Sequence, residues 1–87
     1  MPEQRGYTVF EIVNEKRLEI YVGVTRDPIL QMIETIRHRR PDSIRHWNLD
    51  EVEPVRSIEL DMSEKDARAF VENYVKTSVA DGWRFLT

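Results

Sequence analysis

The sequence predicts a small α+β domain in the order strand, strand, helix, strand, helix, with a three-stranded antiparallel sheet flanked by helices. Two segments of alternating apolar and polar residues lie on either side of a short polar turn, which is typical of a β-hairpin. Two later segments, 29–36 and 67–79, carry apolar residues at every third or fourth position, which is typical of amphipathic helices. A short alternating segment between them supplies the third strand.

The hairpin is predicted from residues 7–25. Tyr7 to Val13 alternates, residues 14–17 are polar and form the turn, and Leu18 to Thr25 alternates again. Gly23 lies inside the second strand, where the lack of a side chain allows a bulge or a close approach of another group to the backbone. The first helix is expected to begin at Asp27-Pro28, with Asp27 as its cap, and to end before Pro41.

The second half of the chain predicts an irregular segment, a strand and a helix. Residues 41–53 are expected to form a loop with a short helical turn, and residues 54–60 an edge strand that begins with proline. Ser63 followed by Asp66 resembles a capping box at the start of the last helix, and Asp81-Gly82 is expected to end it. The remaining residues, 83–87, are expected to run back along the body of the domain.

Length and composition limit what this chain can be. Its 87 residues are expected to form a single domain over 1–87, and 40% hydrophobic residues suffice for a core. There is no cysteine, which excludes a disulfide framework, a thiolate metal site and a cysteine nucleophile, and fits a reducing compartment. No stretch approaches the roughly 20 apolar residues of a membrane span. We therefore expect a cytoplasmic protein without a membrane partner.

Charge is unevenly distributed along the chain. The net charge is −3, which is unlike a strong nucleic-acid binder. Residues 37–46 are nevertheless basic, whereas residues 50–66 are acidic. The basic segment could contact phosphates, although cations also stabilise a helix C-terminus and charged runs commonly do no more than solvate a surface. The four arginines of this candidate nucleic-acid-binding segment are Arg37, Arg39, Arg40 and Arg45.

Several signatures of catalysis are missing from the sequence. It contains no P-loop, GxGxxG, HExxH, CxxC or GxSxG motif. His38 and His46 lie four residues on either side of Asp42, but Pro41 interrupts the helix that would align them. This spacing is therefore a weak metal signal.

The hairpin carries a more specific pattern. Residues 9–14 read VFEIVN, and residues 21–25 read YVGVT. This pair resembles the two halves of the GIY-YIG family of nuclease domains, with Thr8-Val9-Phe10 at the GIY position and Tyr21-Val22-Gly23 at YIG. The predicted order of elements agrees with that family, and the ending GWRFL is similar to the tail of its members. The resemblance covers most of the chain.

The resemblance implies roles for particular residues. Tyr21 would activate the attacking water, Glu72 on the last helix would hold a divalent metal ion, Mg²⁺ or Mn²⁺, and Gly23 belongs to the motif. Three departures weaken this catalytic reading: Phe10 replaces the first tyrosine, Gln31 stands where the family has an arginine, and Arg84 stands where the tail has asparagine. An amide does not neutralise a phosphoryl transition state as a guanidinium does. Arg84, Arg26 or Arg37 could supply the missing charge.

Three functions remain open at this point. The first is a degenerate GIY-YIG-like domain that no longer cuts and acts as a binding module, with DNA or another nucleic acid as its partner. The second is a divergent metal-dependent endonuclease that uses Tyr21, Glu72 and Arg84. The third is a protein-interaction or homodimer module that uses Trp47, Trp83 and the edge strand.

Overall fold

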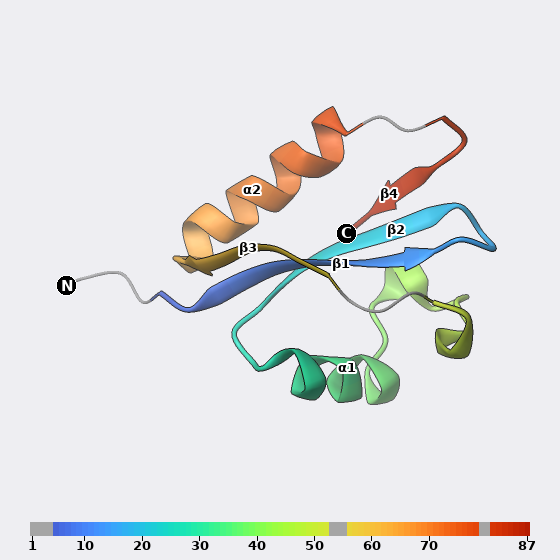
Figure 1. Cartoon of the computed structure of the whole chain (residues 1–87), viewed down its shortest axis with the longest axis horizontal. Coiled ribbons are helices and arrows are strands. Elements are labelled where there is room, and N and C mark those ends of the chain that lie inside the picture. Colours follow the sequence, from blue (N-terminus) through green and yellow to red (C-terminus); the bar gives the residue numbers. More distant parts are fainter. Residues whose placement is uncertain (1–4, 53–55, 79–80) are drawn as a thin grey trace.

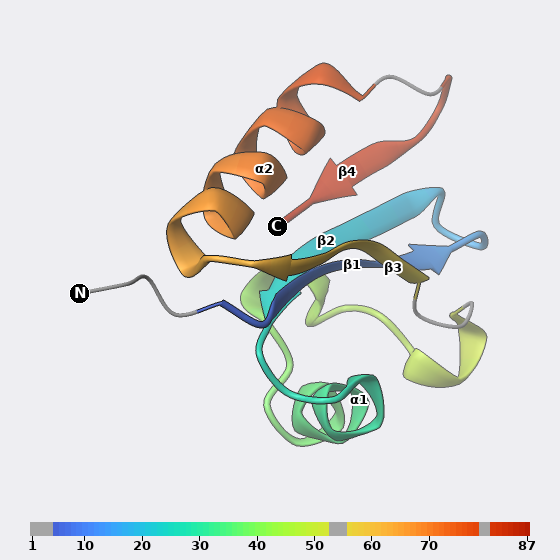
Figure 2. The same cartoon turned by 60° about the vertical axis from the view of Figure 1, so that its left-hand side comes forward.

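The fold consists of one sheet with a helix on each face. The computed structural model describes residues 5–52, 56–78 and 81–87. In these ranges two helices and four strands form a layer of sheet between α1 on one face and α2 on the other (Figures 1 and 2). The strands are β1 (Tyr7–Asn14), β2 (Glu19–Thr25), β3 (Arg56–Met62) and β4 (Arg84–Leu86), and the helices are α1 (Ile29–His38) and α2 (Glu64–Thr77).

The predicted hairpin is confirmed. β1 and β2 pair antiparallel from Thr8↔Thr25 to Asn14↔Glu19. The turn between them is held by the Asn14 side chain, whose Oδ1 accepts a hydrogen bond from the Arg17 backbone N–H at 3.1 Å. β3 pairs antiparallel with β1 and lies at one edge of the sheet, as predicted. The expected start of β3 at residue 54 falls outside the described residues.

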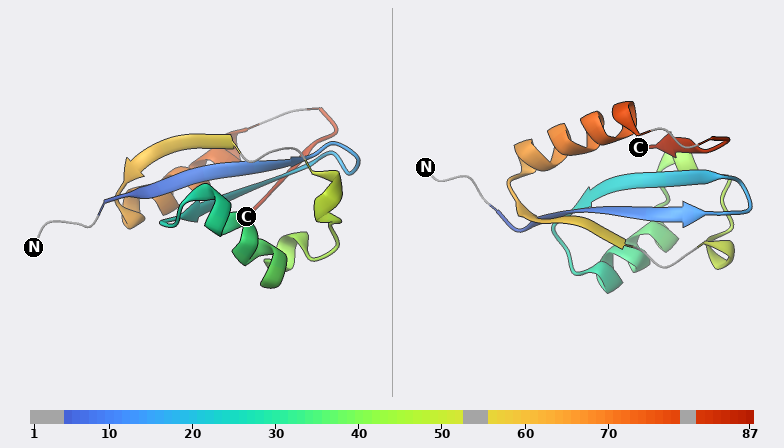
Figure 3. Two further views of the ribbon diagram at one scale, coloured as in Figure 1. Left: turned by 60° about the horizontal axis from the view of Figure 1, so that its bottom comes forward. Right: turned by 45° about the horizontal axis from the view of Figure 1, so that its top comes forward.

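The sheet itself differs from the prediction, which gave three antiparallel strands. Residues 84–86 form a fourth strand that pairs parallel with β2, so the sheet is mixed and has the order β3-β1-β2-β4. β4 lies beside β2 in all the views of Figures 1, 2 and 3. This strand is only three residues long, and its parallel partner is distant in sequence, so no local pattern predicts it.

The helix boundaries also require correction. Asp27 does not cap α1 with its side chain; Pro28 occupies the cap position, and the Asp27 backbone N–H donates to Thr25 Oγ1 at 3.1 Å. α2 begins as predicted, because Ser63 Oγ accepts from the Asp66 N–H at 3.1 Å. It ends at Thr77, well before Asp81-Gly82. Gly82 does have the positive φ that was expected of it, but in a turn beyond the helix.

Two apolar clusters fill the two sides of the sheet. On the α1 side, Phe10 and Ile12 pack against α1 and against the segment after it, which forms the 3₁₀ turns Asp42–Ile44 and Leu49–Glu51. On the α2 side, Val9 and Val22 pack against Ala67 and Val71. Side chains of neighbouring strand residues point to opposite faces, so Tyr21 belongs to the α1 side and Val22 to the α2 side.

On each face of the sheet, a buried glutamate accepts hydrogen bonds from residues of other segments. On the α2 side, Glu11 accepts two hydrogen bonds from Arg56, at 3.1 and 2.8 Å, and one from the Tyr74 hydroxyl at 3.3 Å. On the α1 side, Glu19 lies against residues of two other segments. Its Oε1 is 2.7 Å from His46 Nε2 and accepts from Trp47 Nε1 at 2.9 Å, while Arg84 Nη1 lies 3.7 Å from Oε2.

Candidate functional site

The residues at the GIY and YIG positions are packed against one another. The Phe10 ring is buried, and its centroid lies 6.0 Å from that of Tyr21. A Cβ atom at position 23 would lie 2.7 Å from Phe10 Cζ and 3.0 Å from Tyr21 Cε1, so only glycine fits under these two rings without movement. Gly23 is therefore required by the close approach of side chains from both strands of the hairpin.

Tyr21 opens into a cavity of about 320 Å³ on the α1 side of the sheet. Arg26 from the loop after β2 and Arg39 from the end of α1 line this cavity together with Tyr21, and so does Thr35. Among the described residues that line it, Asp27 is the only acidic one. Arginine and tyrosine side chains are common partners of anions such as phosphate, and both kinds are present among the residues that line this cavity. We call this the tyrosine cavity.

The pKa of the Tyr21 phenol determines whether this residue can act as a general base. Burial raises the pKa of the Tyr21 phenol above its ordinary value of 10.0. A general base works best when its pKa lies near the pH of the reaction. At neutral pH this phenol is therefore protonated, and it is a hydrogen-bond donor rather than a base.

Arg26 and Arg39 reach the tyrosine cavity for different structural reasons. Arg26 lines the cavity because it follows Thr25 directly at the end of β2. Its guanidinium lies 5.6 Å from the ring centroid of Tyr7, which packs with the cluster on the α2 side. Arg39 is the residue that ends α1, where its backbone N–H donates to Thr35 O at 2.7 Å. A cation at this end also complements the negative pole of the helix.

The other arginines of the basic segment are placed differently. Arg40 donates to the backbone carbonyls of Arg45 and Trp47, and thereby holds the segment after α1 in place. Arg45 Nη2 is 2.5 Å from Asp42 Oδ1. Arg37 is exposed in the last turn of α1. The four candidate nucleic-acid-binding residues therefore do not share one role, and only Arg39 lines the tyrosine cavity.

Gln31 and Arg84 are also separated from Tyr21. Gln31 is exposed on α1 and lines a different cavity of about 370 Å³, which adjoins the tyrosine cavity because Thr35 and Arg39 line both. Arg84 lies at the start of β4, beside Glu19. Neither residue lines the tyrosine cavity. Of the candidate substitutes for the family arginine, Arg26 is the one that the fold brings to Tyr21.

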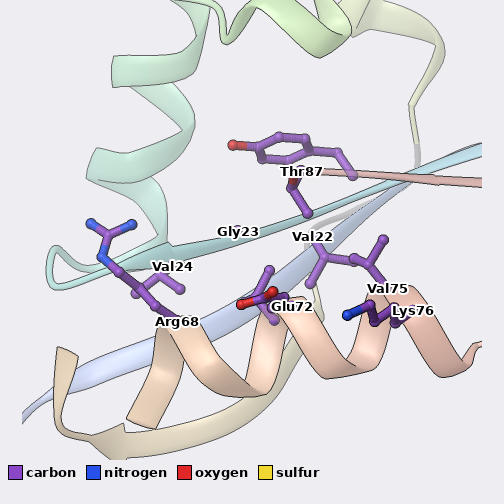
Figure 4. Close-up of a pocket in the computed structure, with 10 residues that line it drawn as sticks. Val22, Gly23, Val24, Arg68, Glu72, Val75, Lys76 and Thr87 are labelled. Carbon is purple, nitrogen blue, oxygen red and sulfur yellow. The ribbon is translucent and has the colours of Figure 1, made fainter. Parts of the chain in front are cut away.

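Glu72 lies on α2, which covers the opposite face of the sheet, and it lines a larger cavity of about 600 Å³ (Figure 4). Tyr21 also borders this cavity, but its ring packs with the cluster on the α1 side. Within the described ranges, no three His, Asp or Glu side chains come together to hold a metal ion.

Sequence reasoning missed two cations that lie beside Glu72. Arg68 and Lys76 line the same cavity from the preceding and following turns of α2 (Figure 4). The signal was present in the sequence, because residues four apart on a helix share a face.

No protein-family model matches this chain, and no curated protein or solved structure matches it significantly. The similarity to GIY-YIG domains therefore stays a prediction from the hairpin motif. None of the helices in the described part is long and apolar enough to cross a membrane.

Proposed function

We propose that this domain is a degenerate GIY-YIG-like module that binds nucleic acid through the tyrosine cavity and does not cut it. The observation that carries the proposal is that Arg26, from the loop after β2, and Arg39, from the end of α1, both line the cavity that Tyr21 lines. Guanidinium groups bind phosphate oxygens through paired, charge-assisted hydrogen bonds, and a protonated phenol can donate a further one.

Three features favour binding over cleavage. Phe10 has no hydroxyl, and its ring rests on Gly23. Gln31 cannot neutralise charge, and it faces another cavity. Tyr21 has a raised pKa, so it does not provide a base at neutral pH. Phosphoryl transfer depends on positioned charge around the reacting phosphate, which this arrangement does not supply in full.

The binding we propose is modest in strength and sensitive to salt. The chain carries a net charge of −3, so long-range attraction to nucleic acid is weak. If the two arginines neutralise two phosphates, the slope of log K against log salt is about −1.8 for duplex and about −1.4 for single strands.

Fluorescence anisotropy with duplex, branched and single-stranded DNA at several salt concentrations tests the proposal. Arg39→Ala is the informative variant, and it should reduce the magnitude of the salt slope by about 1. Arg17→Ala is the matched control, because Arg17 is exposed in the hairpin turn and its backbone hydrogen bond to Asn14 survives the change. Equal loss of binding in both variants, or binding that ignores salt, would refute the proposal.

A further inference from the structure

The outer edge of β2 is only partly occupied by another strand. β4 pairs with its first half, in the parallel register Glu19↔Arg84 to Tyr21↔Leu86. In the described part of the chain, no strand pairs with residues 22–25 along that edge. Residues 22–25 extend past the end of β4, which lies beside the first half of β2 (Figure 3). Backbone N–H and C=O groups along such an edge are a template for an additional strand.

The cavity of about 600 Å³ lies between this free edge and α2 (Figure 4). Thr87, the residue after β4, lines one part of it. The apolar part of its lining comes from both elements and consists of Val22, Val24, Val71 and Val75. An edge strand next to a helix, with an apolar groove between them, is the geometry in which extended peptides bind by strand addition. We call this cavity the edge groove.

Charged side chains from α2 alternate along the rim of the edge groove. Arg68, Glu72 and Lys76 all line it, and all three are exposed. Arg68 Nε donates to Glu64 Oε1 at 3.1 Å, and its terminal amino groups are still able to meet a ligand. In Figure 4, Arg68 lies near Val24 at one end, Lys76 lies at the other, and Glu72 lies between them. The rim therefore reads positive, negative, positive.

We propose that the edge groove binds an extended peptide segment with the pattern acid-x-apolar-x-acid, which adds a strand to β2 in line with β4. Two turns of α2 separate Arg68 from Lys76 by about 12 Å. A strand advances by about 3.3 Å per residue, so residues four apart match this distance. The acids of the peptide pair with Arg68 and Lys76, and the apolar residue between them packs on Val71 and Val75.

Nucleic acid is a poorer occupant of the edge groove. Glu72 lies at the centre of the rim, where it would repel the continuous charge of a phosphate backbone, whereas the proposed peptide has its apolar residue at this point. A strand, in contrast, satisfies the free backbone groups of residues 22–25. This second site lies on the α2 side of the sheet, and the inference does not depend on nucleic-acid binding at the tyrosine cavity.

A titration of ¹⁵N-labelled protein with a blocked peptide of sequence TETVTET tests the inference. We expect saturable amide shifts in residues 22–25 and 68–76, and binding about tenfold weaker for TKTVTKT. Methylation of the backbone nitrogens of the peptide should abolish binding, because it removes the donors that a strand needs.

Charge reversal on α2 provides the decisive comparison. The double variant Arg68→Glu and Lys76→Glu should prefer TKTVTKT, whereas Arg17→Glu with Lys65→Glu, which changes the net charge equally outside the groove, should keep the original preference. The inference is overturned if the peptide causes no saturable shifts in residues 22–25, if the α2 variant keeps its preference, or if a DNA oligonucleotide and not the peptide shifts these residues.

Discussion

The ring of Phe10 covers the backbone of Gly23, at a distance that leaves no room for a side chain. A Cβ at this position would lie 2.7 Å from Phe10 Cζ. This contact accounts for the glycine of the motif in terms of packing alone, because it joins the two strands of the hairpin beneath Tyr21.

Gly23→Ala is expected to lower the free energy of unfolding by about 1–3 kcal/mol, because the added methyl group overpacks the contact with Phe10. Urea unfolding monitored by circular dichroism measures the effect. Phe10→Leu removes the Cζ atom, so the double variant should be more stable than the sum of the single changes implies. Strict additivity would contradict this account of the glycine.

Glu19 is expected to hold together three segments that are distant in sequence. Glu19→Gln removes the charge from hydrogen bonds with His46 and Trp47 and from the contact with Arg84, and should cost roughly 2–3 kcal/mol. Chemical denaturation at neutral pH measures this loss. A loss below about 0.5 kcal/mol would mean that the carboxylate does not hold these segments together.

The same carboxylate should make stability depend on acid pH. Burial alone would raise the pKa of Glu19, but hydrogen bonds from His46 and Trp47 and the charges of His46 and Arg84 outweigh it, so the pKa is lowered below 4.5. Since the unfolded chain binds the proton more readily, this stability is present above about pH 4.5 and is lost as pH falls through the folded pKa. Unfolding curves between neutral pH and about pH 3 should fall less steeply for Glu19→Gln than for the native chain.

The Tyr21 phenol is expected to lose its proton only at high pH, so its contribution to DNA binding should not change with pH near neutrality. Burial raises the pKa of this phenol, so its stabilising contribution is present below about pH 10 and is lost as pH rises through the folded pKa. Ultraviolet titration of phenolate, compared with Tyr21→Phe, identifies the group. The same variant should weaken DNA binding by about 2- to 10-fold through loss of one donor. A marked loss of DNA binding by the native chain between pH 7 and 9 would contradict a neutral phenol.

Supercoiled plasmid incubated with this protein and Mg²⁺ or Mn²⁺ is expected to stay intact. The reason is that the raised pKa keeps the Tyr21 phenol protonated at neutral pH, and that the uncharged Gln31 stands where the family has an arginine. Agarose electrophoresis over several hours measures nicking. Cleavage by the native chain that is lost in each of the single variants Glu72→Gln and Tyr21→Phe would establish the endonuclease alternative instead.

Local sequence patterns predicted most of the helices and strands, but they missed one strand and misplaced the end of one helix. Alternation in residues 7–25 predicted the hairpin, and the Ser63 cap predicted the start of α2. β4 was missed, because residues 84–86 become a strand only by pairing with the distant β2. The end of α2 was placed too late, because the left-handed glycine at position 82 belongs to a turn beyond the helix.

The sequence predicted only part of the candidate site, because some of its residues are positioned by contacts between distant segments. Strand alternation already placed Tyr21 and Gly23 on the same face. The sequence could not show that Arg39, and not Arg40, would reach that face, since Arg40 is held by the carbonyls of Arg45 and Trp47. These contacts depend on the path of the segment after α1, which is irregular and carries no periodic signal.

The most direct measurement of the central claim is an amide-shift titration of the native chain with a short DNA duplex and a single strand of equal length. The account predicts saturable shifts at Tyr21, Arg26, Thr35 and Arg39, which are lost in Arg39→Ala and kept in Arg17→Ala. Shifts that bypass these four residues, or the absence of any saturable shift at low salt, would contradict binding at the tyrosine cavity.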